Sequence, residues 1–364
     1  MKIVRPIAIY LPQFHPIPEN DRWWGQGFTE WHNVKRSLPL FRGHYQPHAP
    51  ASNRFYDLRD PDIREWQAVL ARQHGIHGFC YYHYWFNGKR LLNFPVDERL
   101  RTHQPDFPFC LAWANEDWTR AWDGASGEIL IKQTYTHADD LEHIRFLCSV
   151  FQDPGYIRVD GKPVFIIYKP IFFPDIRKTL ETWREEASRL GIGDLYLCYF
   201  ENEIQQVDPT TLGFDASIEF QPNWWNMPSP LQNDQVELLV PKMDALGTGD
   251  LTHKFFDYTA LMELNIQLGT QIHFKRYRCI VPMWDNTPRR KNDATIFLNA
   301  TPENYGYWLR AILRHFKPSS PQENFVFLNA WNEWGEGNHL EPCKRWSTSF
   351  LEKTKAELNE FIMK

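Results

Sequence analysis

The stretch Phe325-Val326-Phe327-Leu328-Asn329-Ala330-Trp331-Asn332-Glu333-Trp334-Gly335-Glu336-Gly337 begins as an apolar run and ends in two carboxylates. The run is rich in β-branched and aromatic residues and holds no Pro or Gly before Ala330, which predicts a buried strand. Glu333 and Glu336 then fall where this strand leaves the core. Two acids at a strand end can hold different protonation states, as acid/base chemistry on a glycosidic bond requires. For the pair alone, a helix N-terminal acid and a salt-bridged acid would be the commoner explanation, so the surroundings decide.

Apolar runs of this kind alternate with amphipathic segments along the chain. The predicted strands cover Pro6 to Leu11, Gly78 to Tyr84, Phe107 to Ala114, Val164 to Tyr168, Leu195 to Phe200, Ala216 to Phe220, Arg278 to Met283 and Phe325 to Ala330. The predicted helices cover Asp60 to His74, Pro95 to Thr102, His137 to Phe151, Pro174 to Leu190, Asp257 to Leu268, Pro302 to Phe316 and Ser347 to Met363. Such alternation indicates parallel strands joined by right-handed crossovers.

Eight repeats favour a closed barrel over an open doubly wound sheet. An open sheet that binds a nucleotide should show a Gly-rich turn after its first strand, but Pro12-Gln13-Phe14-His15-Pro16 follows instead. We therefore predict an α/β fold in which residues 1–364 form a single (β/α)8 TIM barrel. Elaborated loops would lie at the C-terminal face of the strands, with a loop insertion at about residues 221–254.

Polar and aromatic residues cluster directly after the predicted strands, where the loops of such a barrel open on one face. We expect them to converge on one site, with Glu333 and Glu336 as catalytic residues. The predicted substrate contacts are Trp24, Glu30, Trp31, His83, Trp85, Lys89, Asn115, Glu116, Trp118, Asp123, Asp285, Asn286, Trp331 and Asn332. Some have structural alternatives, since Trp331 would equally plug the barrel mouth and a lone His such as His83 is about as often buried as functional. We interpret Arg289-Arg290-Lys291 as a solvated turn.

Composition agrees with a carbohydrate site and argues against a nucleic-acid-binding protein and a membrane-spanning one. The 16 Trp, 15 Tyr and 26 Phe exceed what a core of this size needs, and such rings can stack on sugars. The net charge of -5, with acids and bases interspersed, predicts no nucleic-acid partner. We find no signal peptide and no apolar run that would span a bilayer, which predicts a cytoplasmic protein without stable membrane insertion.

The cysteines and histidines give no sign of a metal site. The six cysteines are scattered, and we expect four of them to be reduced core residues within strands, namely Cys80, Cys110, Cys198 and Cys279. No Cys-x-x-Cys or His-Glu-x-x-His spacing occurs among them or the 14 histidines. We therefore expect no metal and no cofactor.

Several long motifs resemble those of the WbsX proteins, which are encoded in bacterial polysaccharide gene clusters and usually called glycosyltransferases. The motifs are Tyr10 to Asn20, Trp23-Trp24-Gly25, Gly27 to Trp31, Gly43 to Pro47, Gly78 to Phe86, Trp284 to Thr287, Asn329 to Gly337 and Leu340-Glu341-Pro342. The WbsX proteins are in turn similar to the endo-α-mannosidases of glycoside hydrolase family 99. Those are (β/α)8 barrels with a catalytic Asn-Glu-Trp-x-Glu segment, which here is Asn332 to Glu336.

The resemblance implies roles for the two glutamates. Glu333 would act as a base on the sugar's own 2-hydroxyl and give a 1,2-anhydro intermediate, while Glu336 would protonate the leaving oxygen and then activate water. This scheme needs one acid held neutral and one ionised near pH 7. Asp117 and Cys343 depart from the family pattern, which more often has Asn and Asp there, and this puts substrate contacts in doubt.

Three hypotheses of function remain open at this point. The first is a retaining α-glycoside hydrolase that acts on a mannose- or rhamnose-like bacterial surface polysaccharide or its precursor. The second is a glycosyltransferase, or a transglycosidase, in O-antigen or capsule synthesis, which a cytoplasmic location favours. The third is a non-catalytic glycan-binding barrel, which predicts that Glu336→Gln leaves all function intact. In each case the partner is an oligosaccharide or polysaccharide.

Overall fold

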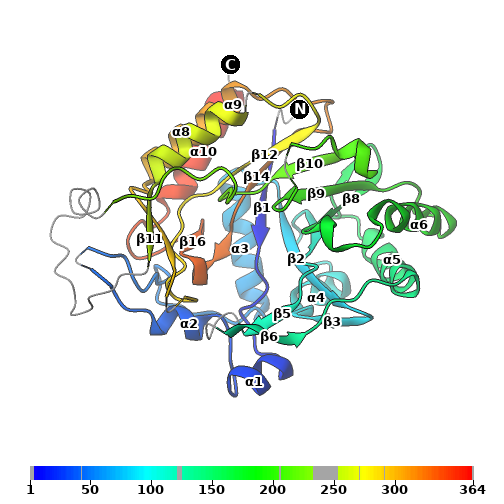
Figure 1. Cartoon of the computed structure of the whole chain (residues 1–364), viewed down its shortest axis with the longest axis horizontal. Helices are drawn as coiled ribbons and strands as arrows, with labels where there is room; N and C mark the ends of the chain where they lie inside the picture. The colour runs from blue at the N-terminus through cyan, green and yellow to red at the C-terminus, as the bar shows by residue number, and fades with distance from the viewer. Residues whose placement is uncertain are drawn as a thin grey trace.

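A closed barrel of parallel strands surrounded by helices forms the centre of the computed structural model (Figure 1). The structure describes residues 4–41, 43–120, 125–204, 206–232, 253–269, 271–290 and 292–362. In this part of the chain eight strands close the barrel, in the order β1 (Arg5–Tyr10), β2 (Gly78–Phe86), β4 (Phe109–Trp113), β8 (Lys162–Ile167), β9 (Tyr196–Glu201), β10 (Ala216–Glu219), β12 (Arg276–Ile280) and β14 (Phe325–Leu328). β14 pairs with β1, which completes the circle. The predicted (β/α)8 TIM barrel is confirmed.

The strands read as continuous apolar runs because both of their faces are covered. In β14 all four residues are buried, and Phe327 lies between Ile7 of β1 and Cys279 of β12. One face of each strand packs inside the barrel and the other packs against helices, as is typical of parallel sheets. Burial of a phenylalanine side chain stabilises the fold by roughly 1.5–3 kcal/mol.

Helices cover the outside of the barrel between successive strands. They are α3 (Pro61–Gln73), α4 (Phe94–Thr102), α5 (His137–Phe151), α6 (Ile176–Arg189), α8 (Tyr258–Gly269), α9 (Pro302–Arg314) and α10 (Ser349–Ile362). Several begin at a side chain that caps the first turn: Asp60 accepts from the Asp62 N–H and Thr136 from the Asp139 N–H. α9 and α10 pack together, and the Tyr305 and Thr354 hydroxyls lie 2.9 Å apart between them. Each of the seven predicted helices is present.

Short elements that the sequence pattern did not predict build up the loops. They are the helices α1 (Pro18–Trp24) and α2 (Trp31–Arg36), the 3-10 turns η2 (Pro170–Phe172), η3 (Pro209–Leu212) and η4 (Trp334–Glu336), and the short strands β3 (Lys89–Leu91), β5 (Trp118–Arg120), β6 (Ala125–Ile131), β7 (Arg158–Val159), β11 (Lys254–Asp257), β13 (Thr295–Leu298), β15 (Asn332–Glu333) and β16 (Asn338–His339). α1, α2, β5 and β6 lie at the end of the barrel toward which β1 points (Figure 1).

Two other predictions bear on the chain as a whole. All six cysteines are buried and free, and the four that we predicted to be reduced core residues are among them. Among the residues that the structure describes, no helix has both the length and the apolar character that a membrane crossing needs. The inner part of the predicted insertion, residues 233–252, lies outside the described residues.

Candidate active site

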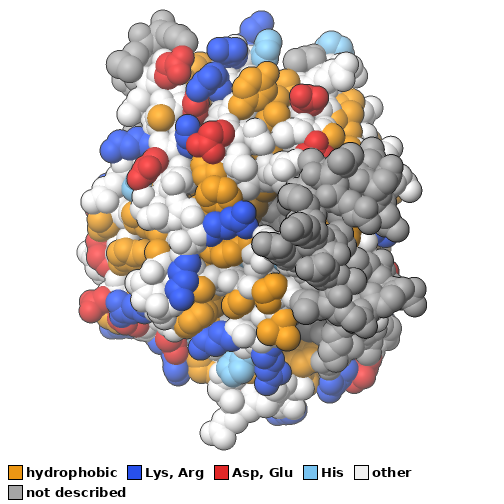
Figure 2. Space-filling view, turned by 90° about the vertical axis from the view of Figure 1, so that its left-hand side faces the viewer, with side chains coloured by type: hydrophobic (Ala, Val, Ile, Leu, Met, Phe, Trp, Pro, Cys, Tyr) orange, Lys and Arg blue, Asp and Glu red, His pale blue; other side chains and the backbone are white. Residues whose placement is uncertain are grey.

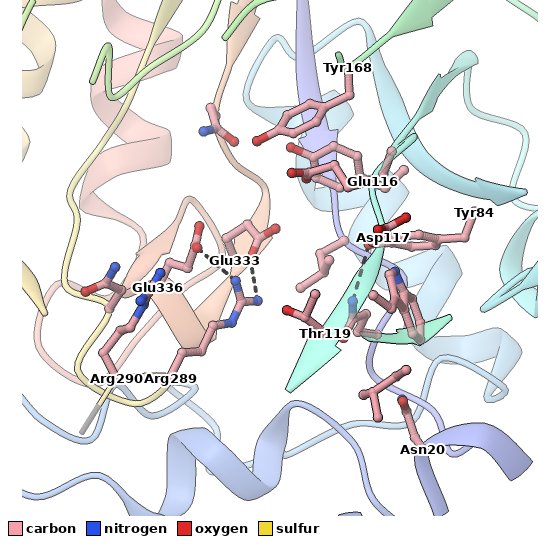
Figure 3. A pocket seen from close by; sticks show the side chains of 18 of the residues that line it. Asn20, Tyr84, Glu116, Asp117, Thr119, Tyr168, Arg289, Arg290, Glu333 and Glu336 are labelled. Atoms are coloured by element: carbon pink, nitrogen blue, oxygen red, sulfur yellow. Dashed lines mark hydrogen bonds and ion pairs between the residues drawn. The ribbon is translucent and has the colours of Figure 1, made fainter. Parts of the chain in front are cut away.

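A cavity of about 450 Å³ opens at the C-terminal end of the barrel strands, and Glu333 and Glu336 both line it (Figure 3). Much of its wall is aromatic, from strand ends and from the added elements: Trp23, Trp24, Tyr82, Tyr84, Trp118, Tyr168, Phe220, Trp224 and Trp284. Across the cavity from the two glutamates lie Glu116 and Tyr168 (Figure 3). The cavity therefore combines two converging carboxylates with rings that can pack against an apolar face.

The local backbone fixes the position of the two glutamates. The Asn332 side chain bridges to β1, because its Oδ1 accepts from the Leu11 N–H at 2.7 Å and its Nδ2 donates to the Leu11 carbonyl at 3.0 Å. Gly335 separates the acids, and a Cβ there would lie 1.9 Å from Glu30 Oε1. Gly337 follows with φ +57°, where a Cβ would lie 2.9 Å from the Asp285 carbonyl oxygen. Both glycines are thus required by close approaches.

The buried carboxylate of Glu341 holds the same turn in place. Glu341 accepts four hydrogen bonds: from Gln67 Nε2 at 2.6 Å, Tyr56 Oη at 2.7 Å, Trp334 Nε1 at 2.7 Å and Trp331 Nε1 at 3.0 Å. Burial raises the pKa of Glu341 to about 7, and these donors oppose that rise. Because Trp331 and Trp334 flank Glu333 in the chain, Glu341 holds the backbone on both sides of the catalytic candidate.

Arg289 links three carboxylates at the bottom of the site. Its Nε lies 2.8 Å from Glu30 Oε1, its Nη2 lies 2.8 Å from Glu333 Oε2, and its Nη1 lies 2.9 Å from Glu336 Oε1. Figure 3 shows its contacts with Glu333 and Glu336 as dashed lines. The Arg289 side chain is only 14% exposed, so our interpretation of this run as a solvated turn was wrong for Arg289. Arg290 is exposed and lines the cavity, and Lys291 lies outside the described residues.

The electrostatics of Arg289 and its three carboxylates favour a proton that Glu333 and Glu336 share. Burial raises the pKa of Glu333 to about 8; the Glu336 and Glu30 charges add to the rise, and Arg289 opposes it. Burial likewise raises the pKa of Glu336, again with Glu30 adding and Arg289 opposing. Burial disfavours the charge of Arg289, but the three carboxylates outweigh this and hold its pKa well above the usual range. One cation cannot balance three anions, so a neutral acid and an ionised one can coexist here.

Four of the predicted substrate contacts line the cavity with the two glutamates: Trp24, Glu116, Trp118 and Asn286. Glu116 is paired with Lys169, whose Nζ lies 2.7 Å from its Oε1. Glu30 lies behind Glu333 and Glu336, fully buried, with its Oε2 lacking a hydrogen-bond partner among the described residues. Asp123 lies outside the described residues.

The side-chain alternation of β2 explains why two other predicted contacts lie away from the cavity. Tyr82 and Tyr84 line it, whereas His83 and Trp85 face the helices outside the barrel. His83 Nε2 lies 3.0 Å from His143 Nε2 on α5, and Trp85 donates to Asp139 Oδ1 at 2.9 Å. Burial lowers the pKa of His83 to about 3, which keeps it neutral. Successive residues of a strand point to opposite faces, and the sequence did not indicate which set faces inward.

The remaining predicted contacts support the fold around the cavity. Trp31 and Trp331 are buried; Trp31 donates to the Tyr56 carbonyl at 2.7 Å and Trp331 donates to Glu341. Asn332 bridges to β1 as described above, and Asn115 donates to the Lys169 carbonyl at 2.8 Å. Lys89 is half exposed and pairs with Glu19, and Asp285 accepts from His44 Nε2 at 2.6 Å in a second cavity.

The two departures from the family pattern have different places in the structure. Asp117 lines the cavity, and its Oδ1 accepts from the Gln133 N–H at 2.6 Å. Cys343 is buried and forms backbone bridges with Pro50 and Ser347. Asp117 therefore lies where a substrate could contact it, although we did not predict it as a contact. Among the described residues, no group of three or more His, Cys, Asp or Glu is arranged to hold a metal ion.

Sequence reasoning missed several residues of the cavity wall. Arg289 is the most consequential of them, and Tyr82, Tyr84, Tyr168, Trp224, Trp284 and Asn329 are the others that bear on the site. The position of Trp284 and Trp224 after strands was a usable signal. No signal in the chain distinguished Arg289 from a surface arginine, because its three partners come from distant segments.

A family model described as glycosyltransferase WbsX matches residues 6–354 of the chain. The chain belongs to the WbsX glycosyltransferase family. Two relatives, both named WxcX, come from Xanthomonas campestris pv. campestris, strains B100 and ATCC 33913; they are 41% and 40% identical over 353 residues. The alignments cover 97% of this chain and 49% of each relative, so the chain spans about half the length of these curated relatives.

Solved structures show the same fold. The GH99 endo-α-mannosidase from Bacteroides thetaiotaomicron superimposes with a TM-score of 0.59 at 14% identity, over 99% of this chain and 98% of that one. A protein described as glycoside hydrolase-like gives 0.59 at 13% identity, over 98% and 94% of the two chains. This WbsX chain therefore combines membership of a glycosyltransferase-named family with a fold found in a glycoside hydrolase.

Proposed function

We propose that this protein is a retaining α-glycoside hydrolase of endo-α-mannosidase type, with Glu333 and Glu336 as its catalytic residues. The observation that carries the proposal is the convergence of two carboxylates with raised pKa values on one guanidinium, inside an aromatic-walled cavity. A non-catalytic glycan-binding site needs aromatic walls but no such acid cluster, which is why we place that hypothesis last.

The chemistry follows from the protonation states. In the first step Glu333 removes the proton of the sugar 2-hydroxyl as O2 attacks C1, and the bond from C1 to the leaving oxygen breaks as Glu336 protonates that oxygen. In the second step the water oxygen attacks C1 and the C1–O2 bond breaks, while Glu336 takes the proton from water and Glu333 returns its proton to O2. The pKa of about 8 makes Glu333 a stronger base than an ordinary carboxylate, although only about 10% of it is ionised at pH 7.

Arg289 would hold the carboxylates of Glu333 and Glu336 in place through these steps. Its guanidinium contacts Glu333 and Glu336 through different nitrogens, so each carboxylate keeps one oxygen for substrate. Trp24, Trp118 and Trp224 would stack on sugar rings and Asn286 would donate to a hydroxyl. We propose an α-linked mannose- or rhamnose-like substrate, from a bacterial surface polysaccharide or its precursor, because both sugars carry the 2-hydroxyl that the first step uses.

The family description favours a second candidate, a glycosyltransferase in O-antigen or capsule synthesis. A transglycosidase would join the two candidates, since a sugar hydroxyl would replace water in the second step with the same residues in the same roles. The choice between water and sugar as acceptor leaves the assignment of Glu333 and Glu336 unchanged.

The test is an assay of the purified protein on α-mannosyl and α-rhamnosyl oligosaccharides, with and without nucleotide sugars. Glu333→Gln and Glu336→Gln are the active-site variants, and Glu65→Gln, which changes an exposed residue of α3, is the matched control. Cleavage without a nucleotide donor, lost in both active-site variants and kept in the control, supports the hydrolase. Transfer that occurs only from a nucleotide sugar overturns it in favour of the glycosyltransferase.

A further inference from the structure

A second cavity of about 420 Å³ lies next to the catalytic turn. Trp284 lines both cavities, and Gly337, which directly follows Glu336, lines the second one. The Asp285 N–H donates to the Glu336 carbonyl at 2.7 Å, so the loop in the wall of this cavity is bonded to the backbone of a catalytic residue. The two cavities are therefore neighbours, and Trp284 forms part of the wall of both.

The second cavity has a cation at its wall. The Arg345 guanidinium lies 5.3 Å from the Tyr45 ring centroid and 5.1 Å from that of Trp346, and all three residues line the cavity. Within the described part of the chain, no acid side chain forms an ion pair with Arg345. A guanidinium on aromatic rings is weakly hydrated and keeps its planar donors available for a carboxylate or a phosphate.

The other polar side chains described in this cavity are hydrogen-bonded to one another or neutral. The Arg345 guanidinium is therefore the charge available to a ligand. Asp285 Oδ2 accepts from His44 Nε2 at 2.6 Å, and Oδ1 accepts from the Thr287 hydroxyl at 2.7 Å. The tautomer of His44 is set, because its Nδ1 accepts from the Leu40 N–H at 3.0 Å. Burial lowers the pKa of His48 to about 4; the Asp285 charge opposes this effect and the Arg345 charge adds to it, so His48 is neutral.

Figure 2 views the molecule from the side on which β11 lies in Figure 1, and β13, which pairs with β11, lines the second cavity. Hydrophobic side chains lie among Lys and Arg side chains over the middle of this face (Figure 2). Aromatic rings beside an available cation are what a sugar with an acidic substituent needs: rings for its apolar face and a guanidinium for its anion.

We propose that the second cavity binds a sugar unit that carries one anionic group, a carboxylate or a phosphate, with the anion on Arg345 and the sugar ring against Tyr45 or Trp346. Because Trp284 and Gly337 connect this cavity to the catalytic turn, the bound unit belongs to the same glycan as the one cleaved. That second statement rests on the proposed function, whereas the anion site does not. The substrate is then an acidic polysaccharide.

The test measures binding by isothermal titration calorimetry and by tryptophan fluorescence, with glucuronic acid, glucose 6-phosphate and neutral glucose as probes. Arg345→Gln removes the cation, and Lys344→Gln is the matched control because it removes the same charge at the preceding residue, which is exposed and does not line the cavity. We expect one or both acidic probes to bind the wild-type protein and Lys344→Gln at least tenfold more tightly than Arg345→Gln. Added salt should weaken this binding.

Two outcomes would overturn the proposal: acidic probes that bind no better than glucose, or an Arg345→Gln variant that binds them as tightly as the wild type. Equal thermal midpoints for Arg345→Gln and Lys344→Gln would show that the loss is not caused by misfolding. Which of the two acidic probes binds identifies the anion. The Glu336→Gln variant separates this test from the proposed function, because it should keep full binding of the acidic probe whether or not the protein hydrolyses any glycoside.

Discussion

Replacement of Arg289 by Gln tests the electrostatic reasoning most directly. The variant removes the cation that lies 2.8 to 2.9 Å from three carboxylates and leaves a neutral side chain of similar shape. Arg289 opposes the rise in the pKa of both Glu333 and Glu336. Without it, both acids should stay protonated to a higher pH, and the base of the first step should disappear at pH 7.

The size of the effect follows from the geometry. Opposite charges about 4 Å apart attract by ~4 kcal/mol at an effective dielectric constant of about 20. At ~1.4 kcal/mol per pKa unit, this corresponds to a rise of at most about 3 in the pKa of Glu333. Its ionised fraction at pH 7 would fall from about 10% to between ~0.01% and ~0.1%. We therefore expect kcat/KM at pH 7 to fall ~100- to 1,000-fold and to recover as the pH rises.

Two measurements check this prediction. One is the pH dependence of kcat/KM on an α-mannoside with a chromogenic leaving group. The other needs no activity: a carbon NMR titration of protein labelled at the glutamate carboxyls, with Glu333→Gln to assign the signal. Arg290→Gln is the comparison, since it removes the same charge from an exposed neighbour and should change kcat/KM less than tenfold. A Glu333 pKa in Arg289→Gln within one unit of the wild-type value would refute the reasoning.

Three further predictions concern stability and binding. Burial raises the pKa of Glu333 from 4.5 to about 8. The contribution of this group to stability is therefore complete below pH 4.5 and is lost as the pH rises through 8. The midpoint of thermal unfolding of Glu333→Gln should accordingly rise relative to wild type between pH 5 and pH 9. Glu341→Gln places an amide against donors that now bond to a carboxylate, and urea unfolding should show a loss of about 1–3 kcal/mol that the surface change Glu65→Gln does not cause. Trp24→Ala should weaken oligosaccharide binding about three- to tenfold in calorimetry, whereas Trp66→Ala on α3 should leave it unchanged.

The fold was predictable from the sequence because buried parallel strands are apolar on both faces. The run from Phe325 to Leu328 reads as a strand whichever way its side chains point, since one face meets the barrel interior and the other meets helices. The same property prevents the sequence from showing which strand residues line the cavity. In β2 every residue is buried, so no hydrophobic alternation separates Tyr82, which lines the cavity, from His83, which faces α5.

Arg289 illustrates what a linear pattern does not contain. Three consecutive basic residues are most often solvated, and only the tertiary fold brings Glu30 from the segment after β1 and Glu333 from the segment after β14 onto one guanidinium. The two acids are 303 positions apart in the chain, and neither is near Arg289 in sequence. The glutamate pair was predictable because both members follow the same strand; its cation was not.

The charge of the catalytic cavity bears on the choice between hydrolysis and transfer from a nucleotide sugar. In the described wall four acids, Glu116, Asp117, Glu333 and Glu336, face two arginines. Arg289 is already shared by three carboxylates, which leaves exposed Arg290 as the cation for a new anion. A nucleotide diphosphate leaving group would bring its negative charges against these acids, and like charges in a confined site repel strongly. In the proposed mechanism a glycoside would leave as a neutral alcohol after protonation by Glu336, so we propose a glycoside as the donor, whether water or a second sugar accepts the glycosyl group.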